Sequence, residues 1–299
     1  MKIIEFDLSN VPTSYPDLAL CLGFFDGLHL GHQKIIDEAK SSGKEVALLS
    51  FSTPPAYVIG RKDTLRSITS IDDKADILES LGVSYLFIMP FNSQIQNLSR
   101  LEFINLVLKK INPFAIYCGE DFRFGKGGLG TAKFLSHYFP THVVPLQKYN
   151  GEKFSSKTIR HLIFDGKIKE ANTLLGHPYR MGGYVGVGAQ RGTLIGFPTA
   201  NMELDFIYVI PANGVYMGYA HIHEEKYKCL ISIGTHPTLG ELDAPIIEVY
   251  IIDFSEKIYG SFLFIEFIDR IRDINKYDNV DDLVKQIKLD VKYASNNLK

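Results

Sequence analysis

The sequence LALCLGFFDGLHLGHQKIIDEAK, residues 18–40, predicts the architecture of the first half of the chain. It opens with an apolar run, residues 18–22, which is typical of a buried strand. The segment after the glycines has apolar residues at helical spacing, and that pattern stops at Gly43. A strand that leads through a glycine-rich turn into a helix is typical of an α/β sheet, which places its ligands beyond the carboxyl ends of its strands.

The same alternation of strand and helix signals continues to residue 146. A capping box, Ser99 to Glu102, opens one helical stretch, and residues 72–81 predict another. Further apolar runs that are typical of strands cover residues 46–51, 85–89, 114–118 and 142–146. Strands separated by helices predict a parallel sheet with helices on both faces.

The character of the sequence changes after Pro178. The preceding stretch, residues 155–175, is helical and polar, with glycine breaks. Beyond it, short strand-like runs cover residues 184–188, 215–222, 229–233, 246–252 and 262–268. Closely spaced strands with turn residues between them predict a small β-barrel, and residues 281–293 predict a closing amphipathic helix. We therefore expect two domains, residues 1–178 and 179–299.

The composition is that of a globular protein from a reducing compartment. The 299 residues include 32 Lys and Arg against 34 Asp and Glu, a net charge of −2, which argues against binding to nucleic acid or an anionic membrane. Cys21, Cys118 and Cys229 form no CxxC pair, so neither a disulfide framework nor a thiolate zinc site is indicated. Because no signal-peptide pattern or membrane-length apolar run is visible, we expect a cytoplasmic protein.

The turn GFFDGLHLGH, residues 23–32, is the first candidate site. Its glycines let the backbone approach a ligand closely. His29 and His32 stand at the start of the predicted helix, where imidazoles, free N–H groups and the helix dipole together suit polyphosphate oxygens. On the residues alone, two other interpretations stay open. The histidines could be metal ligands, although no third ligand stands close in sequence, or ordinary exposed residues at a helix start.

The full spacing G-x-F-D-G-x-H-x-G-H resembles the HxGH nucleotidyltransferase signature, in the form found in prokaryotic bifunctional riboflavin kinase/FAD synthetases. Two further segments resemble that family: GEDFRFG, residues 119–125, and SSKTIR, residues 155–160, whose family counterpart lines the ATP phosphates. Alone, the first could be a tight turn with two core phenylalanines, and the second a helix N-cap with a solvated arginine. Together and in this order, they favour the family interpretation.

The segment GGYVGVGAQRGTLIGFPTANM, residues 182–202, is the second candidate site. Its glycines suit a loop that wraps phosphates through backbone N–H groups. Thr199 and Asn201 carry neutral oxygens two residues apart, which face the same side of an extended segment and suit Mg²⁺. The glycines alone would fit a plain hairpin with a proline turn equally well.

The run GFPTAN is more specific, because it resembles the PTAN motif of riboflavin kinases, whose domain is a small β-barrel. Downstream, GVY at residues 214–216 and GTHPT at residues 234–238 resemble further kinase segments. Glu248 lies in an apolar run, where a carboxylate either faces solvent or is kept for chemistry. The resemblance implies that it is the base that accepts the proton of the ribityl 5′-hydroxyl. Arg272 matches a family arginine near the nucleotide or flavin, although a solvated strand-end arginine fits nearly as well.

The resemblance implies a fold, a function and a set of site residues. The fold is α/β: a Rossmann-like nucleotidyltransferase domain, then a small β-barrel riboflavin kinase domain with a terminal helix. The function is ATP- and Mg²⁺-dependent phosphorylation of riboflavin to FMN, then adenylylation of FMN to FAD with release of pyrophosphate. Catalytic roles fall to His29, His32 and Glu248, and Mg²⁺ binding falls to Thr199 and Asn201. Residues expected to bind ATP or flavin are Gly23, Phe25, Asp26, Gly31, Asp121, Phe122, Ser155, Ser156, Arg160, Gly186, Gly188, Gly192, Pro198, Thr199, Asn201 and Arg272. The partners implied are these small-molecule substrates, with no nucleic acid and no membrane, and self-association stays open.

Three positions depart from the family pattern. The segment Phe51-Ser52-Thr53-Pro54-Pro55 has neither the acid nor the histidine usual there, Lys157 replaces a threonine, and Thr193 replaces a frequent arginine. The first departure keeps open a riboflavin kinase whose N-terminal domain has lost adenylylation. A nucleotidyltransferase for another metabolite would explain the first turn but not Glu248. A non-catalytic flavin or nucleotide sensor would not need a base at that position.

Overall fold

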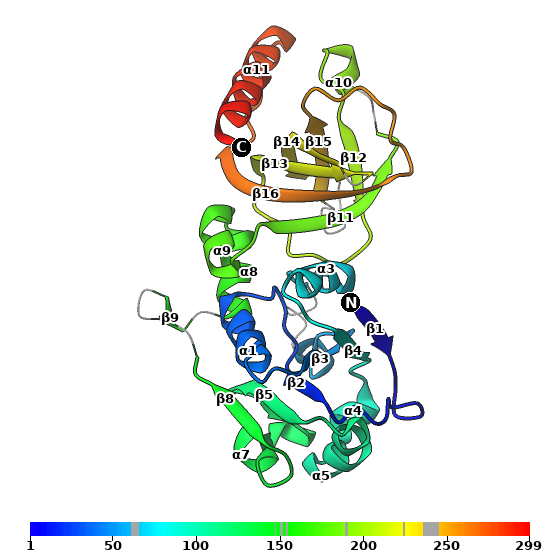
Figure 1. Cartoon of the computed structure of the whole chain (residues 1–299). Helices are drawn as coiled ribbons and strands as arrows, with labels where there is room; N and C mark the ends of the chain where they lie inside the picture. The colour runs from blue at the N-terminus through cyan, green and yellow to red at the C-terminus, as the bar shows by residue number, and fades with distance from the viewer. Residues whose placement is uncertain are drawn as a thin grey trace. The chain divides into compact units, whose positions relative to one another are not determined.

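The computed structural model describes residues 1–60, 66–146, 148–149, 152–153, 155–188, 191–223, 225–235 and 245–299. It divides into two compact units, Met1–Ser156 and Lys157–Lys299 (Figure 1). The second unit takes in most of the helical stretch after residue 155, which we had assigned to the first domain. The domain boundary at residue 178 therefore stays a prediction.

The first unit is built on a six-stranded sheet in the order β1-β4-β3-β2-β5-β8, with every pair parallel. Its strands are β1 (Lys2–Glu5), β2 (Leu18–Leu22), β3 (Glu45–Phe51), β4 (Tyr85–Met89), β5 (Ala115–Gly119) and β8 (Thr141–Val144). Its helices are α1 (Leu30–Lys40), α2 (Pro55–Val58), α3 (Ile71–Ser80), α4 (Ser93–Asn97), α5 (Arg100–Phe103), the π-helix η2 (Ile104–Leu108), α6 (Lys109–Ile111), the 3₁₀ turn η3 (Lys126–Gly128) and α7 (Ala132–Leu135). Two small hairpins join β6 (Arg123–Phe124) to β7 (Gly130–Thr131) and β9 (Lys148–Tyr149) to β10 (Glu152–Lys153).

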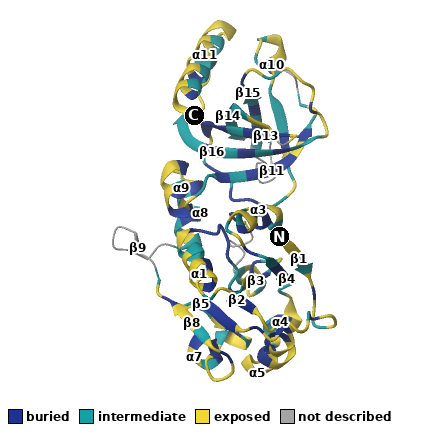
Figure 2. Ribbon diagram, viewed as in Figure 1, coloured by how far each residue is buried: buried dark blue, intermediate teal, exposed yellow. Residues whose placement is uncertain are grey.

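Alternate side chains of the sheet enter two separate cores. Cys21 of β2 packs with Ile36 of α1 and Leu78 of α3, whereas Leu20 packs on the opposite face with Leu108 of η2. Because both faces are covered, the central strands contain near-continuous apolar residues. Figure 2 shows the central strands as mostly buried and the outer faces of the helices as exposed. The predicted parallel sheet with helices on both faces is confirmed.

The second unit contains a closed barrel in the order β11-β12-β15-β14-β13-β16. Its strands are β11 (Tyr179–Gly186), β12 (Ala200–Leu204), β13 (Gly214–Ile222), β14 (Glu225–Thr235), β15 (Pro245–Ile251) and β16 (Phe262–Arg272). Its helices are α8 (Ser156–Phe164), which begins at the last residue of the first unit, α9 (Ile168–Leu175), α10 (Arg191–Leu194) and α11 (Val280–Asn297). Every neighbouring pair of barrel strands is antiparallel. The predicted β-barrel with a terminal helix is therefore confirmed.

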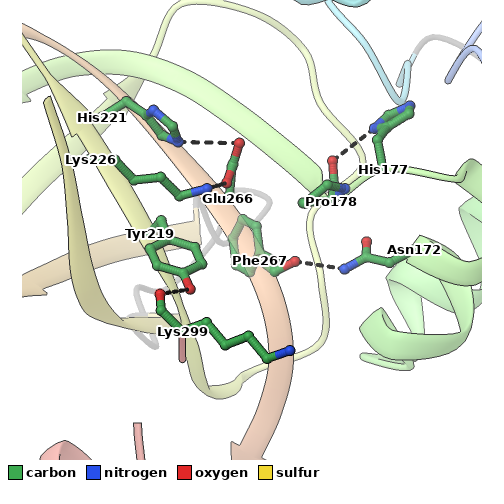
Figure 3. A network of polar contacts seen from close by, with 9 residues as sticks. All are labelled: Asn172, His177, Pro178, Tyr219, His221, Lys226, Glu266, Phe267 and Lys299. Carbon is green, nitrogen blue, oxygen red and sulfur yellow. Dashed lines mark hydrogen bonds and ion pairs between the residues drawn. The ribbon is translucent and has the colours of Figure 1, made fainter. Parts of the chain in front are cut away.

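Polar contacts fasten the helices of the second unit to the barrel. On α9, Asn172 donates its side-chain N–H to the carbonyl of Phe267 on β16, as Figure 3 shows. At the end of α11, Lys228 of β14 donates to the carbonyls of Ser295 and Leu298, which a cation at a helix C-terminus satisfies well. The hydroxyl of Tyr219 on β13 donates to the carbonyl of Lys299 (Figure 3). The contacts of Lys228 and Tyr219 hold the end of α11 against the barrel. This helix forms a wall of the site described below.

The structure adds elements that we did not predict. The edge strand β1 and the strand β12 are the main ones, and β14 is longer than the predicted residues 229–233. Across the part of the chain that the structure describes, no helix is long and apolar enough to cross a membrane.

Candidate active sites

The turn between β2 and α1 has an unusual backbone. Phe25, Gly27 and Leu28 all have positive φ, at 53°, 78° and 41°. For bulky side chains such as Phe25 and Leu28 this conformation is costly, and it persists only where the surroundings impose it. Both of these side chains are almost fully buried. Gly23 begins the turn, and a Cβ there would lie only 3.0 Å from the Phe25 ring.

Backbone and side-chain contacts from the segment before α3 hold this turn. The Asp26 carboxylate is 2 % exposed and accepts hydrogen bonds from the backbone N–H groups of Ile68 and Thr69, at 2.9 and 3.3 Å. The hydroxyl of Thr69 accepts a bond from the N–H of Gly27. One oxygen of Asp26 therefore supports the turn, and its predicted contact with ATP or flavin stays a prediction.

His29 and His32 form one unit at the start of α1. The rings stack with centroids 3.6 Å apart. His29 is the N-cap of α1, and its Nδ1 accepts a hydrogen bond from the N–H of His32, so that a neutral His29 carries its ring proton on Nε2. Burial lowers the pKa of His32 well below its usual value, and the charges of His29 and Lys74 add to this effect. His32 is therefore neutral at pH 7 and acts as a hydrogen-bonding group, not as a cation.

The other residues predicted for this site lie on three elements. Gly31 is in the first turn of α1, where backbone N–H groups are free of helical partners. Asp121, which is exposed, and Phe122, which is half-buried, follow the carboxyl end of β5, and β5 is the neighbour of β2 in the sheet. The structure therefore brings these two residues to the sheet edge that carries the His29 turn.

The segment Ser155–Arg160 reaches the turn through one of its members. The hydroxyl of Ser156 donates to the carbonyl of Asp26 at 2.9 Å. Ser155 directly precedes α8, and Arg160 follows Ser156 by four residues, so that Ser156 and Arg160 share a face of this helix. The predicted role of Arg160 at nucleotide phosphates stays a prediction.

A cavity of about 450 Å³ opens beside this sheet edge. Its lining is strongly aromatic and includes Gly23, Phe51, Phe91, Phe103, Phe122 and Phe124. Pro55, from the segment that departs from the family pattern, also lines it. The wall formed by that segment is thus apolar, which suits a flat aromatic ligand whose stacking partners are phenylalanines.

In the barrel, the strand register aligns the candidate groups in a single row. Asn201 lies directly opposite both Gly186 and Glu248, and Glu248 lies directly opposite Ser232. The row continues through Val215 to Arg272. Residues directly opposite one another on antiparallel strands project from the same face. The structure therefore gathers Asn201, Glu248 and Arg272, which are far apart in sequence, on one face.

Two cavities meet at Thr199. The first, of about 420 Å³, is lined by barrel residues of the row and by α11, and includes Gly192, Thr199, Ser232, Glu248, Arg272, Tyr277 and Asp290. The second, of about 520 Å³, includes Thr193, Pro198, Thr199, Lys257 and Tyr259. Because Thr199 lines both, a group bound at Thr199 could contact ligands in either cavity.

The glycines of the second candidate site are required by close approach. A Cβ at Gly188 would lie 1.9 Å from Nδ2 of Asn201, and a Cβ at Gly192 would lie 2.3 Å from the carbonyl oxygen of Phe197. The loop therefore lies directly against the segment of Thr199 and Asn201; at Gly192 a Cβ would meet backbone, whereas at Gly188 it would meet the end of the Asn201 side chain. Residues 236–238 of the predicted GTHPT segment lie outside the described residues.

Asp290 is a site residue that the sequence analysis missed. This carboxylate on α11 is 3 % exposed and accepts three hydrogen bonds from Arg272: from Nε to Oδ1 at 3.1 Å and to Oδ2 at 3.0 Å, and from Nη2 to Oδ2 at 2.7 Å. Gln286 donates a further bond to Asp290. The signal was available, because Asp290 follows Ile287 by three residues and so lies on the apolar face of the helix. Arg272 is thus a paired residue of the cavity wall, not a solvated strand end.

The donor set in the barrel fits Mg²⁺. Among the residues that the structure describes, no group of three or more His, Cys, Asp or Glu side chains could hold a metal ion. Thr199, Asn201 and Glu248 instead offer hard oxygen atoms, and Mg²⁺ typically combines few protein ligands with water and substrate phosphates. Its binding by Thr199 and Asn201 stays a prediction.

Comparisons with known proteins identify the family of each half of the chain. Residues 175–298 match the family described as riboflavin kinase, and residues 12–158 match that described as FAD synthetase. The bifunctional riboflavin kinase/FMN adenylyltransferase of Bacillus subtilis (strain 168) is 37 % identical over 293 residues, covering 93 % of this chain and 92 % of the relative. The chain belongs to this bifunctional family.

A second riboflavin kinase/FMN adenylyltransferase and a solved structure are similar over nearly the whole chain. That of Listeria monocytogenes is 36 % identical over 280 residues, covering 91 % of this chain and 89 % of the relative. A crystal structure from Streptococcus pneumoniae, described as a macrolide-efflux protein, is 33 % identical, with a TM-score of 0.90 and 99 % of each chain covered. The family that the motifs predicted is thus confirmed over the whole chain.

Proposed function

We propose that this chain makes both flavin cofactors. Its barrel unit phosphorylates riboflavin to FMN with ATP, and its parallel-sheet unit joins FMN to the AMP part of ATP and releases pyrophosphate. The matches to both family halves and the full-length bifunctional relatives support both activities. They do not favour a riboflavin kinase with an inactive N-terminal domain.

The kinase reaction rests on the row of side chains in the barrel, which is the observation that carries the proposal. Glu248 faces the first cavity and would accept the proton of the ribityl 5′-hydroxyl as that oxygen attacks the γ-phosphorus of ATP. Thr199 and Asn201 would hold Mg²⁺, which neutralises charge on the phosphates when bound. With Thr199 between the cavities, riboflavin would occupy the one beneath α11 and ATP the other.

The adenylyl transfer needs positioning and charge stabilisation, with no covalent enzyme intermediate. An FMN phosphate oxygen would attack the α-phosphorus of ATP, and the bond to pyrophosphate would break. His29 and His32 would donate hydrogen bonds to the developing charge, together with the N–H groups at the start of α1. Arg160 would hold the outgoing phosphates. The phenylalanine-lined cavity would take the isoalloxazine ring of FMN.

A chromatographic product assay tests both activities. The protein is incubated with Mg·ATP and either riboflavin or FMN, beside the matched variants Glu248→Gln and His32→Ala. We expect FMN and FAD from riboflavin, with Glu248→Gln blocking only the first step and His32→Ala only the second. Loss of both steps in either variant, or of neither, would refute this division of labour.

A cytoplasmic location, the absence of a nucleic-acid partner and the oligomeric state all stay predictions. Fractionation of the host cell and light scattering of the purified protein would test the first and the last.

A further inference from the structure

A buried lysine lies behind the His29 turn. Lys74, on α3, is 3 % exposed, and its Nζ donates hydrogen bonds to the carbonyl of Phe24 at 2.8 Å and to the hydroxyl of Ser50 at 3.0 Å. Ser50 is itself fully buried and donates its hydroxyl to the same Phe24 carbonyl. Burying an ammonium group is costly, and an apolar side chain would fill the space more favourably. Packing therefore does not explain the presence of Lys74.

The contacts of Lys74 fall on the first residue of the strained turn. Phe24 directly precedes Phe25, whose φ is 53°. The other end of the turn is held by Ile68 and Thr69, which directly precede α3. The turn is therefore held at both ends by α3 and the residues directly before it. Lys74, together with Ser50 of β3, holds the Phe24 end through hydrogen bonds.

Lys74 also sets the charge around the histidine pair. The charged and titratable groups near it are Asp26 on the turn, His32 with its stacked partner His29 on α1, and Asp73 on its own helix. Burial lowers the pKa of Lys74 to about 8, and the charge of Asp26 opposes that effect. The Lys74 cation in turn contributes to keeping His32 neutral. Below about pH 8, this site thus has a buried positive charge behind the neutral imidazole of His32.

We propose that Lys74 is a positioning residue for adenylyl transfer, which holds the strained Phe24–Leu28 turn and supplies the positive charge behind the His29–His32 pair. This inference rests on the proposed FAD-forming activity of the same unit. Lys74 does not touch the substrates and acts through the Phe24 carbonyl and through its field. The negative charge that develops on the reacting phosphates in the transition state gains from that field only while Lys74 is protonated.

Two substitutions at Lys74 separate its charge from its volume. Lys74→Met removes the charge, and Lys74→Arg keeps a cation that does not deprotonate in the accessible range. FAD formation from FMN is measured from pH 6 to 9.5, and riboflavin phosphorylation by the same preparations is the internal control. A displaced turn lowers kcat more than it raises KM, and a misplacement of about 1 Å costs about 100-fold.

We expect Lys74→Met to lower kcat for FAD formation by about 100-fold, with KM for FMN within about twofold of the wild type and kinase activity unchanged. Wild-type kcat/KM for FAD formation, which reports the free enzyme, should fall above about pH 8. We call this fall in kcat/KM at high pH the alkaline limb. In Lys74→Arg it should move beyond the measured pH range, and in Lys74→Met it should be absent. Wild-type kinetics in Lys74→Met, or the same alkaline limb in all three proteins, would overturn the proposal.

A second variant covers the case in which the lysine substitutions disturb folding. Ser50→Ala removes one hydrogen bond to the Phe24 carbonyl and leaves Lys74 in place. We expect kcat for FAD formation to fall less than in Lys74→Met, and the alkaline limb to be retained. An unchanged kcat in Ser50→Ala, together with no limb in the wild type, would also overturn the proposal. A wild-type protein that makes no FAD would refute the proposed activity itself, which distinguishes the two failures.

Discussion

Arg272 and Asp290 form an ion pair with three hydrogen bonds between β16 and α11, and Nη2 lies 2.7 Å from Oδ2. Both residues line the cavity that contains Glu248. The pair therefore joins the last strand of the barrel to the helix that closes the cavity, and bonds from both Nε and Nη2 fix the direction of the Arg272 guanidinium.

Removing the carboxylate should weaken both the barrel and riboflavin binding. Because Asp290→Ala leaves the partly buried guanidinium of Arg272, 18 % exposed, without its carboxylate partner, we expect the barrel unit to lose about 2 kcal/mol of unfolding free energy, and KM for riboflavin to rise. Denaturant unfolding and kinase kinetics measure the two effects. Asp281→Asn, an exposed substitution on the same helix, is the control. A variant with normal stability and KM would show that the pair has no role.

Asn201 should govern the magnesium requirement of the kinase. Asn201→Ala removes a predicted metal ligand, and we expect the Mg²⁺ concentration for half-maximal kinase activity to rise by about tenfold or more. The matched control is Ser232→Ala, which lies on the other side of Glu248 in the same row. Activity is measured at fixed ATP over a series of Mg²⁺ concentrations. An equal shift in both variants would count against metal binding by Asn201.

His29 has two roles that substitutions can separate. His29→Ala removes both the imidazole and the N-cap of α1, whereas His29→Asn keeps a capping acceptor. We expect both variants to lose about 100-fold or more in FAD formation, as when a donor to developing charge is removed. Only His29→Ala should also lose about 1 kcal/mol of stability. If His29→Asn keeps full activity, capping is the only role of His29.

Glu266 should make the second unit sensitive to acid. Burial raises the pKa of this carboxyl, but hydrogen bonds and charge from His221 and Lys226 outweigh burial and hold the pKa at about 2 (Figure 3). A depressed carboxyl pKa stabilises the fold above the unfolded-state value near 4.5, and this stability is lost as pH falls toward about 2.

Unfolding free energies measured from pH 6 to pH 2 test this prediction. We expect Glu266→Gln to flatten the profile below pH 4.5, and Glu256→Gln, at an exposed site in the same unit, to leave it unchanged. Identical profiles in the two variants would contradict the assignment to Glu266.

Much of the fold followed from local sequence patterns. The apolar run at residues 85–89 coincides with β4, and the capping box at Ser99 is present. The strand β12, ANMEL, escaped prediction because it is short and only weakly apolar, so that its pairing with β11 and β15 defines it. The strands β11 and β15 are separated from β12 in sequence, and no local sequence pattern predicts these pairings.

Some of the site residues could be identified from sequence motifs, whereas others depend on partners that are distant in sequence. Glycine turns and motif residues such as His32 and Glu248 could be identified from the sequence, because their types and spacing are specific. For Lys74 and Asp290 the sequence indicated only burial and gave no role, since each is one of several charged residues within an amphipathic helix. Their positions on the buried faces were visible in the spacing to Leu78 and Ile287, but the groups that they bind come from elsewhere in the chain.

The row from Gly186 through Asn201, Glu248, Ser232 and Val215 to Arg272 has a consequence for how activity is acquired. Each of its members comes from a different strand of a closed ring, and a slip of one residue in any strand would turn its member to the other face. The complete row therefore exists only where all of these strand pairs are in register. Riboflavin phosphorylation thus depends on the register of six strands at once, and a register error in one strand would be detected as lost kinase activity.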